Sequence, residues 1–315
     1  GYCDFKGMPQ ARQAICDYET SKGIKGITPD DVFIGNGVSE VVSFALTPLL
    51  NDGDEVLVPS PSYSLWGNSV YLEDGKPVFY TCDEQANWYP DIQDIRSKIT
   101  DKTCAIIMET VQGEGGIYPA AREFIQGVRK LCDEKDILLI LDEIQCGMGR
   151  TGHYFAWQAY GVQPDIMTCA KALGCGVPVG AFVLGEKAAE SSLVPGDHGT
   201  TYGGNPFVCA AVSKVFDIFE QDKILDHVQE LTPYLEEKLN ALVDKYPVVA
   251  ARRGKGFMQG LVIEGATVGS VVTKALESGL LVISAGSDVL RLVPPLVITK
   301  ENIDEMIEKL EKSLA

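Results

Sequence analysis

The chain has 315 residues, 45% of them hydrophobic, which is enough for a large core and two domains. Its formal net charge of −17 excludes nucleic acid as an expected partner, because such a surface repels phosphate backbones. No apolar run is long enough to cross a bilayer, so we expect neither a membrane partner nor a leader peptide. The nine cysteines are scattered and the three histidines lie far apart, so we expect reduced thiols, a cytoplasmic location and no metal site.

Short β-rich runs alternate with helical patterns over the first two thirds of the chain. A helix is expected at 121–133, where apolar residues recur at helical spacing. Continuous apolar strands between such helices predict an α/β fold whose mostly parallel sheet is flanked by helices. Ligands of such sheets bind at the carboxyl ends of the strands. The expected strands cover 32–35, 55–59, 77–80, 104–108, 137–142, 165–168 and 180–184.

The pattern changes after about residue 221. A long charged helix, three β-rich runs and a final amphipathic helix are expected at 223–246, 248–251, 257–263, 289–293 and 300–314. Thr299 is the expected N-cap of the final helix. We therefore predict a large domain over 29–221 and a smaller α+β domain over 222–315. The N-terminal segment 1–28 is expected to pack with the small domain.

Two residues stand where this kind of sheet would place a ligand. Asp142 ends the apolar run 137–142, and Lys171 enters the small-residue turn 168–174. An acid and a lysine in these positions suit pyridoxal phosphate (PLP). The catalytic lysine would hold the cofactor as a Schiff base, and the aspartate would keep the pyridine nitrogen protonated. Taken alone, each residue is better explained as a strand-end carboxylate or a surface lysine.

Two further segments follow expected strands at the same edge of the sheet. In the segment 35–40, backbone amides and the Ser39 hydroxyl could bind a phosphate at a helix start, although an ordinary N-cap at Ser39 explains the same residues. Tyr63 follows the strand 55–59, and its ring could stack on a pyridine. A packed loop tyrosine is an equal alternative.

The motifs of the chain resemble two classes of one enzyme fold, the PLP-transferase fold type I. Residues 1 to about 108 resemble class I aminotransferases of the alanine aminotransferase-like branch, through 35–40, 54–59, Tyr63 and Trp66. Residues from about 109 to 315 resemble class III aminotransferases, most closely acetylornithine aminotransferase. The class III runs are 109–116, 141–152, 170–174, 198–206 and 290–296.

A join near residue 108 is topologically coherent, because both classes share the fold and place a motif after the equivalent strand. Natural recombination, a designed fusion and an assembly artefact would each leave such a join. The resemblance also implies that the front of the chain is short, since both classes carry an N-terminal arm and more of the small domain before this point.

The resemblance implies cofactor contacts residue by residue. Gln145 matches the class III glutamine that donates to the cofactor's phenolic oxygen. Thr201 and Tyr2 resemble residues that reach the phosphate from the neighbouring subunit, so a homodimer with shared sites is implied. The full set of expected cofactor residues is Gly37, Val38, Ser39, Tyr63, Asp142, Gln145, Lys171, Thr201 and Tyr2.

The resemblance also implies how substrates bind. Arg291 resembles the arginine that grips the substrate α-carboxylate, and Glu114 resembles the acid that pairs with it when an ω-amino substrate is bound. A structural ion pair for Arg291 and a solvated loop acid for Glu114 are the alternatives. Tyr63 and Trp66 are expected as class I-type contacts to the substrate.

The implied function is PLP-dependent transamination between N-acetylornithine and 2-oxoglutarate, in arginine biosynthesis. Alanine:2-oxoglutarate transamination, related class III chemistry such as an aminomutase, and a folded hybrid without catalytic activity are the alternatives.

Overall fold

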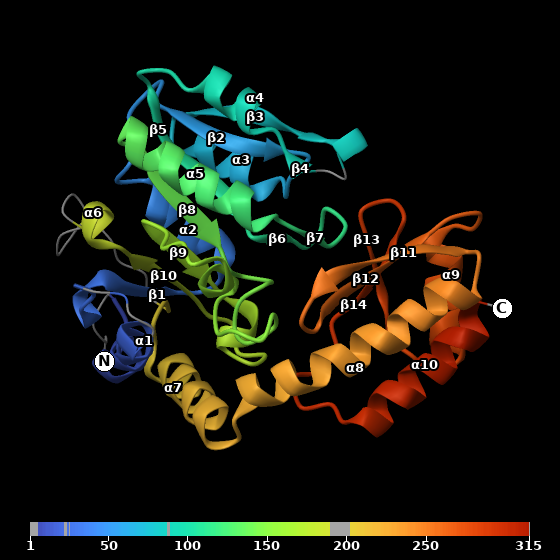
Figure 1. Ribbon diagram of the computed structural model, residues 1–315. Coiled ribbons are helices and arrows are strands. Elements are labelled where there is room, and N and C mark those ends of the chain that lie inside the picture. Colours follow the sequence, from blue (N-terminus) through green and yellow to red (C-terminus); the bar gives the residue numbers. More distant parts are fainter. Residues whose placement is uncertain (1–5, 22–23, 25, 87–88, 190–201, 315) are drawn as a thin grey trace.

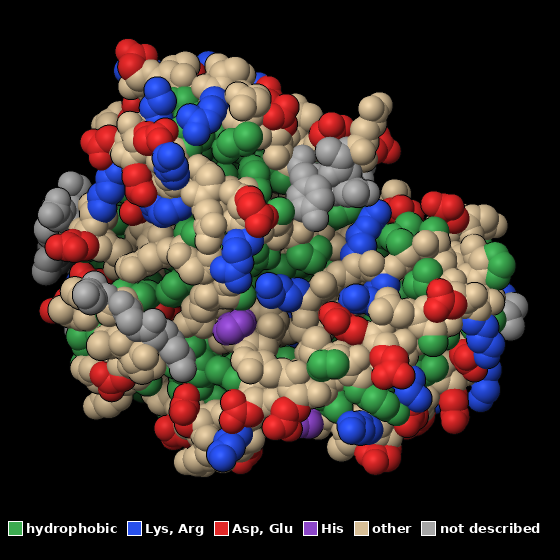
Figure 2. Space-filling model, in the orientation of Figure 1, with side chains coloured by type: hydrophobic (Ala, Val, Ile, Leu, Met, Phe, Trp, Pro, Cys, Tyr) green, Lys and Arg blue, Asp and Glu red, His purple; other side chains and the backbone are tan. Residues whose placement is uncertain are grey.

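Two sheets organise the protein. The computed structural model describes residues 6–21, 24, 26–86, 89–189 and 202–314. An eight-stranded sheet has helices on both faces, and a four-stranded sheet is backed by the last helices of the chain (Figure 1). We call residues up to 221 the large region and those from 224 the small region. Acidic and basic side chains are interspersed on the face shown in Figure 2, so negative charge is spread over this surface rather than gathered in one patch.

The large sheet is mostly parallel, as predicted. Its strands are β1 (Val32–Gly35), β2 (Glu55–Ser60), β3 (Lys76–Asp83), β4 (Tyr89–Pro90), β5 (Thr103–Glu109), β8 (Leu138–Asp142), β9 (Ile166–Cys169) and β10 (Gly180–Leu184). Strands β3, β2, β5, β8 and β9 are neighbours in this order and run in one direction. Strand β10 is antiparallel to both β9 and β1, and β4 is antiparallel to β3. All seven strands expected from the sequence are present.

Apolar side chains fill both faces of this sheet, because successive strand residues point to opposite sides. In β8, Leu139 and Leu141 join the core beneath α5 (Arg122–Lys135), whereas Ile140 joins the core beneath α2 (Val38–Leu46) and α3 (Leu65–Leu72). The other elements of the large region are α1 (Pro9–Ser21), α4 (Ile92–Lys98), α6 (Glu186–Ala189), α7 (Pro206–Gln221), β6 (Val111–Gln112), β7 (Tyr118–Pro119) and the short turns η1 (Pro29–Asp31), η2 (Glu84–Ala86), η3 (Ala156–Tyr160) and η4 (Lys171–Leu173).

The small region is antiparallel and matches the predicted α+β pattern. Its elements are α8 (Ile224–Lys245), β11 (Val249–Lys255), β12 (Met258–Ile263), α9 (Val268–Glu277), β13 (Ile283–Ala285), β14 (Val289–Leu292) and α10 (Lys300–Leu314). The strands lie in the order β11, β12, β14, β13. Thr299 caps α10 as expected, because its Oγ1 accepts from Asn302 N at 3.3 Å. None of the helices in the described ranges is long and apolar enough to cross a membrane.

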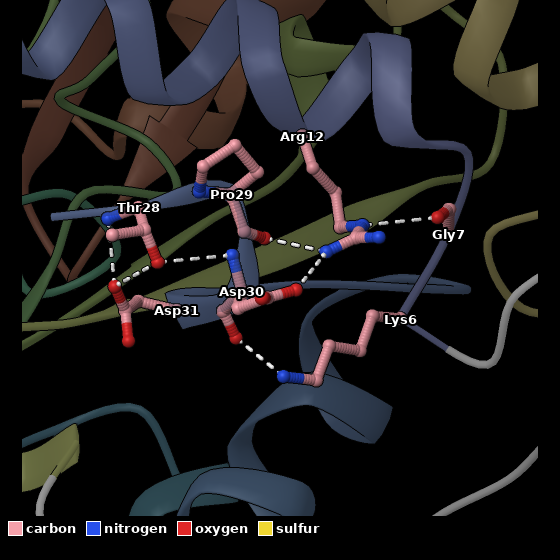
Figure 3. A network of polar contacts seen from close by, with 7 residues as sticks. All are labelled: Lys6, Gly7, Arg12, Thr28, Pro29, Asp30 and Asp31. Atoms are coloured by element: carbon pink, nitrogen blue, oxygen red, sulfur yellow. Dashed lines mark hydrogen bonds and ion pairs between the residues drawn. The ribbon is translucent and has the colours of Figure 1, made fainter. Parts of the chain in front are cut away.

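The N-terminal helix α1 packs on the large region, which corrects the expectation that its segment packs with the small domain. The ring centroid of Tyr18 lies 6.0 Å from that of Phe216 in α7. At the other end of α1, Arg12 Nη1 donates to Pro29 O and so ties the helix to the turn before β1 (Figure 3). Aromatic packing and hydrogen bonds therefore both hold α1 beside β1 and α7.

Candidate active site

The carboxyl ends of the parallel strands meet at one edge of the large sheet, and the predicted site residues gather there. Strand β1 runs in the same direction as β9, because both are antiparallel to β10, so the loop after Gly35 reaches the same edge as Asp142 and Lys171. A cavity of about 670 Å³ opens at this edge. It is lined by Val38, Pro61, Ser62, Tyr63, Ser64, Glu109, Glu114, Gly115, Tyr118, Asp142, Ile144, Gln145, Lys171, Gly286, Ser287 and Asp288.

Two carboxyl groups lie next to each other on the floor of this cavity. Asp142 ends β8, Glu109 ends β5, and the strand register pairs the two residues directly. Asp142 Oδ1 accepts from Ile144 N at 2.8 Å, and Glu109 Oε2 accepts from Gly113 N at 3.0 Å. Burial raises the pKa of Asp142, and burial together with the charge of Asp142 raises the pKa of Glu109. Since Lys171 and the backbone offset these shifts only in part, the floor is short of positive charge.

Lys171 lines the same cavity from the turn after β9. Its backbone is left-handed, with φ at 46°, a region that few residues other than glycine occupy. Within the described part of the chain, no hydrogen bond or ion pair holds its ammonium group. Strained backbone conformations cluster at functional sites rather than in ordinary surface turns. Here the strained residue is a lysine without a hydrogen bond or ion pair among the described residues, close to two buried acids.

The loop after β1 supplies backbone N–H groups at the start of α2. Gly37 is the N-cap, with φ at 135°, and no side chain caps the helix, so the alternative of a cap at Ser39 is wrong. Gly37 also approaches β10 closely: a Cβ added to Gly180 would stand 2.8 Å from Gly37 C. Val38 lines the cavity, so the amino end of α2, which favours anions, borders it.

Arg291, Glu114 and Gln145 form a closed hydrogen-bonded triangle between the two regions. Arg291 Nη1 donates to Glu114 Oε1 at 2.5 Å and to Gln145 Oε1 at 2.9 Å. Gln145 Nε2 donates to Glu114 Oε1 at 3.2 Å. Burial raises the pKa of Glu114, but the hydrogen bond and charge of Arg291, with the hydrogen bond from Gln145 and the charge of Lys171, outweigh burial and hold the pKa below its usual range. Arg291 Nε is buried with no partner among the described residues, so the guanidinium keeps a donor for a further acceptor.

Backbone contacts fix the position from which β14 presents Arg291. Before this strand, Gly286 N donates to Glu114 O at 2.8 Å. After it, Pro294 O accepts from the Arg150 side chain. Because the large region holds both ends of the strand, the guanidinium reaches the cavity rim in a defined place.

The structure brings together most of the predicted site residues. The cavity is lined by Val38, Tyr63, Glu114, Asp142, Gln145 and Lys171, and Arg291 bonds to two of these. Gly37 and Ser39 flank Val38 in the same turn. Trp66 is only 2% exposed and packs in the core beneath α3, which corrects its expected contact with the substrate. Tyr2 and Thr201 lie outside the described residues.

Glu109 is the functional candidate that the sequence analysis missed. It directly follows the expected strand 104–108, just as Asp142 ends the expected strand 137–142. The signal was therefore available, because acids at the carboxyl ends of two parallel strands meet when those strands are neighbours. What the sequence did not show is that β5 and β8 are adjacent.

The residues present fit a ligand with a cationic ring and a phosphate. Asp142 and Glu109 offer negative charge at the floor, the amino end of α2 offers amides to an anion, and Lys171 offers an amine for a covalent bond. This donor set agrees with the cofactor expected from the sequence. In the described ranges, no group of three or more His, Cys, Asp or Glu residues could hold a metal ion.

Curated proteins match a large part of the chain. An acetylornithine aminotransferase of Methanocaldococcus jannaschii is 48% identical over 226 residues, which are 71% of this chain and 56% of that protein. One from Clostridium acetobutylicum is 44% identical over 252 residues, which are 80% of this chain and 64% of that protein. The chain thus spans 56–64% of the length of these two relatives.

Solved structures match the whole fold. The N-acetylornithine aminotransferase of Stenotrophomonas maltophilia has a TM-score of 0.79 at 30% identity and covers 98% of this chain and 80% of that chain. An ornithine δ-aminotransferase of Plasmodium falciparum has a TM-score of 0.81 at 26% identity and covers 99% of this chain and 80% of that chain. The expected aminotransferase fold is confirmed.

The family match also reaches into the front of the chain. The model described as aminotransferase class-III matches residues 68–314, including 68–108, a stretch that resembled class I. The fold, the site and this match agree, and the chain belongs to the class III aminotransferase family.

Proposed function

We propose that this chain acts as a PLP-dependent aminotransferase on N-acetylornithine and 2-oxoglutarate, a reaction of arginine biosynthesis. The observation that carries the proposal is the meeting of Lys171, Asp142 and the Arg291–Glu114 pair around one cavity. Relatives named as acetylornithine aminotransferases support the choice of substrate.

Each part of the cavity floor has a role in this proposal. Bound there, PLP would supply an electron sink for a substrate carbon that loses a proton. Lys171 would bind the cofactor covalently through Nζ and, after the substrate amine displaces it, would move the proton at that carbon. Asp142 would face the ring nitrogen and hold its proton, because its buried carboxylate gains a cationic partner there. Residues 37–39 would hold the phosphate through their amides.

Other cavity residues would orient the cofactor ring. Tyr63 is 47% exposed and lines the cavity, so its face is free to stack on the ring. Gln145, on the turn that follows Asp142, would donate to the phenolic oxygen.

The Arg291–Glu114 pair would let one cavity accept two kinds of substrate. The reacting end of acetylornithine carries no carboxylate, so the pair would stay closed against it. The α-carboxylate of glutamate would replace Glu114 on Arg291, since a guanidinium binds a carboxylate through two donors and Arg291 Nε is without a partner among the described residues.

Alanine:2-oxoglutarate transamination is the second candidate, and the front of the chain favours it. We propose that the segment ahead of residue 68, which the class III match does not reach, descends from a class I-like protein, as the motifs 35–40 and 54–59 suggest. In that case Tyr63, which borders the cavity, was not selected for a long acetylated side chain. A hybrid that binds PLP without turnover is a further alternative.

We also propose a cytoplasmic homodimer with shared sites. Thr201 and Tyr2 would contact the phosphate of the neighbouring subunit. Close to Thr201 in sequence, Tyr202 is 74% exposed and Phe207 is 72% exposed, which leaves aromatic surface for a second chain. Mixing Thr201→Ala chains with Lys171→Ala chains should restore activity, because one site of a mixed dimer would have both residues intact. An inactive mixture with confirmed subunit exchange would argue that Thr201 acts within its own chain.

A screen of half-reactions tests the function directly. The PLP-loaded protein is mixed in turn with acetylornithine, ornithine, alanine and glutamate, and the visible absorbance of the bound cofactor is followed. We expect glutamate and acetylornithine to change it. Alanine reacting much faster than acetylornithine would replace the first proposal with the second, and no change with any amine would support the non-catalytic alternative.

A further inference from the structure

The side-chain amide of Gln145 bonds to both members of the Arg291–Glu114 pair. Its Oε1 accepts from Arg291 Nη1 at 2.9 Å, and its Nε2 donates to Glu114 Oε1 at 3.2 Å. The orientation of the amide follows from chemistry, because a guanidinium only donates and a carboxylate only accepts. The ion pair therefore sits inside a triangle with three hydrogen bonds rather than standing alone.

Packing holds the amide in this place. A Cβ on Gly113 would stand 2.4 Å from Gln145 Cδ and 2.5 Å from its Nε2 and Oε1. The side chain thus lies directly against the backbone of the turn that carries Glu114. That turn is itself anchored on the floor, since Gly113 N donates to Glu109 Oε2 at 3.0 Å.

We propose that Gln145 is a positioning residue that holds the Arg291–Glu114 pair closed and so sets the balance between ω-amino donors and α-carboxylate substrates. This inference rests on the proposed function, in which Arg291 receives the substrate carboxylate.

Opening the pair costs more with Gln145 present than without it. When Glu114 leaves Arg291, Gln145 Nε2 loses a charged acceptor, and hydrogen bonds to charged groups are the stronger class. The bond from Arg291 Nη1 to Gln145 Oε1 can persist in the open state. The substrate carboxylate can bind Arg291 Nε instead, which has no partner among the described residues. Gln145 therefore favours the closed state specifically, and opening releases one of its N–H groups.

The test is a double-mutant cycle on substrate preference. Gln145→Met keeps the length of the side chain and removes both hydrogen bonds. We expect the ratio of the glutamate to the acetylornithine half-reaction, as kcat/KM, to rise about fivefold to tenfold, with the KM for glutamate falling. In a Glu114→Gln background the same change should leave the ratio within about twofold, because no ion pair is left to hold closed.

Two outcomes of the cycle would overturn the proposal. An unchanged or lower ratio in Gln145→Met would do so, because a contact to the cofactor alone would slow both half-reactions alike. An equal effect in the Glu114→Gln background would also do so. Gln112→Met is the matched control, since this glutamine ends β6 just before the turn that carries Glu114 but contacts Cys82 Sγ, at 3.6 Å. It should leave the ratio unchanged.

A binding measurement separates this inference from the proposed function. Glutarate has two carboxylates and no amine or keto group, so it binds to the PLP-loaded protein without reacting. By calorimetry, Gln145→Met should bind glutarate about fivefold to tenfold more tightly than the unchanged protein, even if no amine is turned over. Equal or weaker binding, or no binding by either protein, would overturn the role of Gln145 whatever the half-reactions show.

Discussion

The acids on the floor of the cavity, Asp142 and Glu109, have raised pKa values, whereas the acid at its rim, Glu114 in the triangle with Arg291 and Gln145, has a lowered one. On the floor, burial raises the pKa of Asp142, burial and the charge of Asp142 raise the pKa of Glu109, and the charge of Lys171 offsets these shifts only in part. At the rim, burial also raises the pKa of Glu114, but the hydrogen bond and charge of Arg291, the hydrogen bond from Gln145 and the charge of Lys171 together hold it below its usual range. The carboxyl groups are chemically the same, so the difference comes from what the fold places beside them.

This difference in charge balance suits the floor to a cationic ligand and makes the rim selective toward anionic ones. A buried acid without a partner is costly, so a cation that enters the floor stabilises the protein as it binds. An ion pair that is already complete resists a new anion, because the anion must first replace one partner. The floor is therefore built to receive the cofactor, and the rim is built to choose between substrates.

The largest expected loss of activity comes from removing Lys171, the amine that lines the cavity. Lys171→Ala should abolish transamination, because no other amine among the described residues lines the cavity to bind the cofactor covalently and move the proton. PLP can still bind through the acids and the amides of α2. Half-reaction rates and retained PLP measure the two effects separately, and turnover at the original rate would overturn the whole interpretation of the site.

The next change removes the acid of the floor that faces the ring nitrogen. Asp142→Ala should lower the rate by roughly 10²–10³-fold, the range for losing one preorganised electrostatic partner. Single-turnover kinetics with glutamate measures it. Glu109→Gln is the matched variant on the neighbouring strand, and we expect it to be less affected. A loss within twofold for Asp142→Ala would mean that Glu109, not Asp142, serves the ring.

At the rim, the expected loss is smaller and depends on the substrate. Arg291→Ala should weaken the glutamate half-reaction by roughly 2–3 kcal/mol, about 30-fold to 150-fold, because a charge-assisted carboxylate contact is lost. The acetylornithine half-reaction should change less. Arg252→Ala, on β11, is the control, since Arg252 pairs with Glu236 outside the cavity. Equal losses with both substrates would make Arg291 a structural residue.

Asp142 and Lys171 could be predicted from local pattern, whereas Glu109 and the rim could not. Asp142 and Lys171 follow apolar runs, and strand ends of a parallel sheet meet at one edge, so their proximity follows from sequence periodicity. Arg291, on β14, and Glu114, in the turn between β6 and β7, are 177 residues apart, so only the family resemblance brought them together.

The two wrong expectations, for Trp66 and for the segment 1–28, also concern contacts that depend on the three-dimensional packing. Trp66 was expected at the site from the class I resemblance, but its place on α3 turns it into the core with Val70, one helical turn later. The surface on which the segment 1–28 packs could not be predicted, because packing partners far away in sequence leave no local signal.

The smallest expected effect is a change in melting temperature that tests the charge of the floor acids and requires no catalytic activity. Because the folded-state pKa values of Asp142 and Glu109 are raised, the stability that these groups contribute is full below about pH 4, near their unfolded pKa values, and is lost as the pH rises through the folded values. Without PLP, Glu109→Gln should therefore raise the melting temperature at pH 8, on the order of 2 °C, and much less at pH 5.

Glu55→Gln gives this prediction its control, because the sign is reversed there. The hydrogen bond from Lys76 lowers the pKa of Glu55, so this acid contributes stability that is present above its unfolded pKa and lost as the pH falls. Its replacement should lower the melting temperature more at pH 8 than near pH 3. Thermal melts of the PLP-free variants compare the two acids, and PLP should remove most of the gain from Glu109→Gln, because the cofactor supplies the missing cation. A gain for Glu109→Gln that is the same at pH 5 and pH 8 would mean that the floor acids do not share a charge deficit, and the contrast between floor and rim would fail.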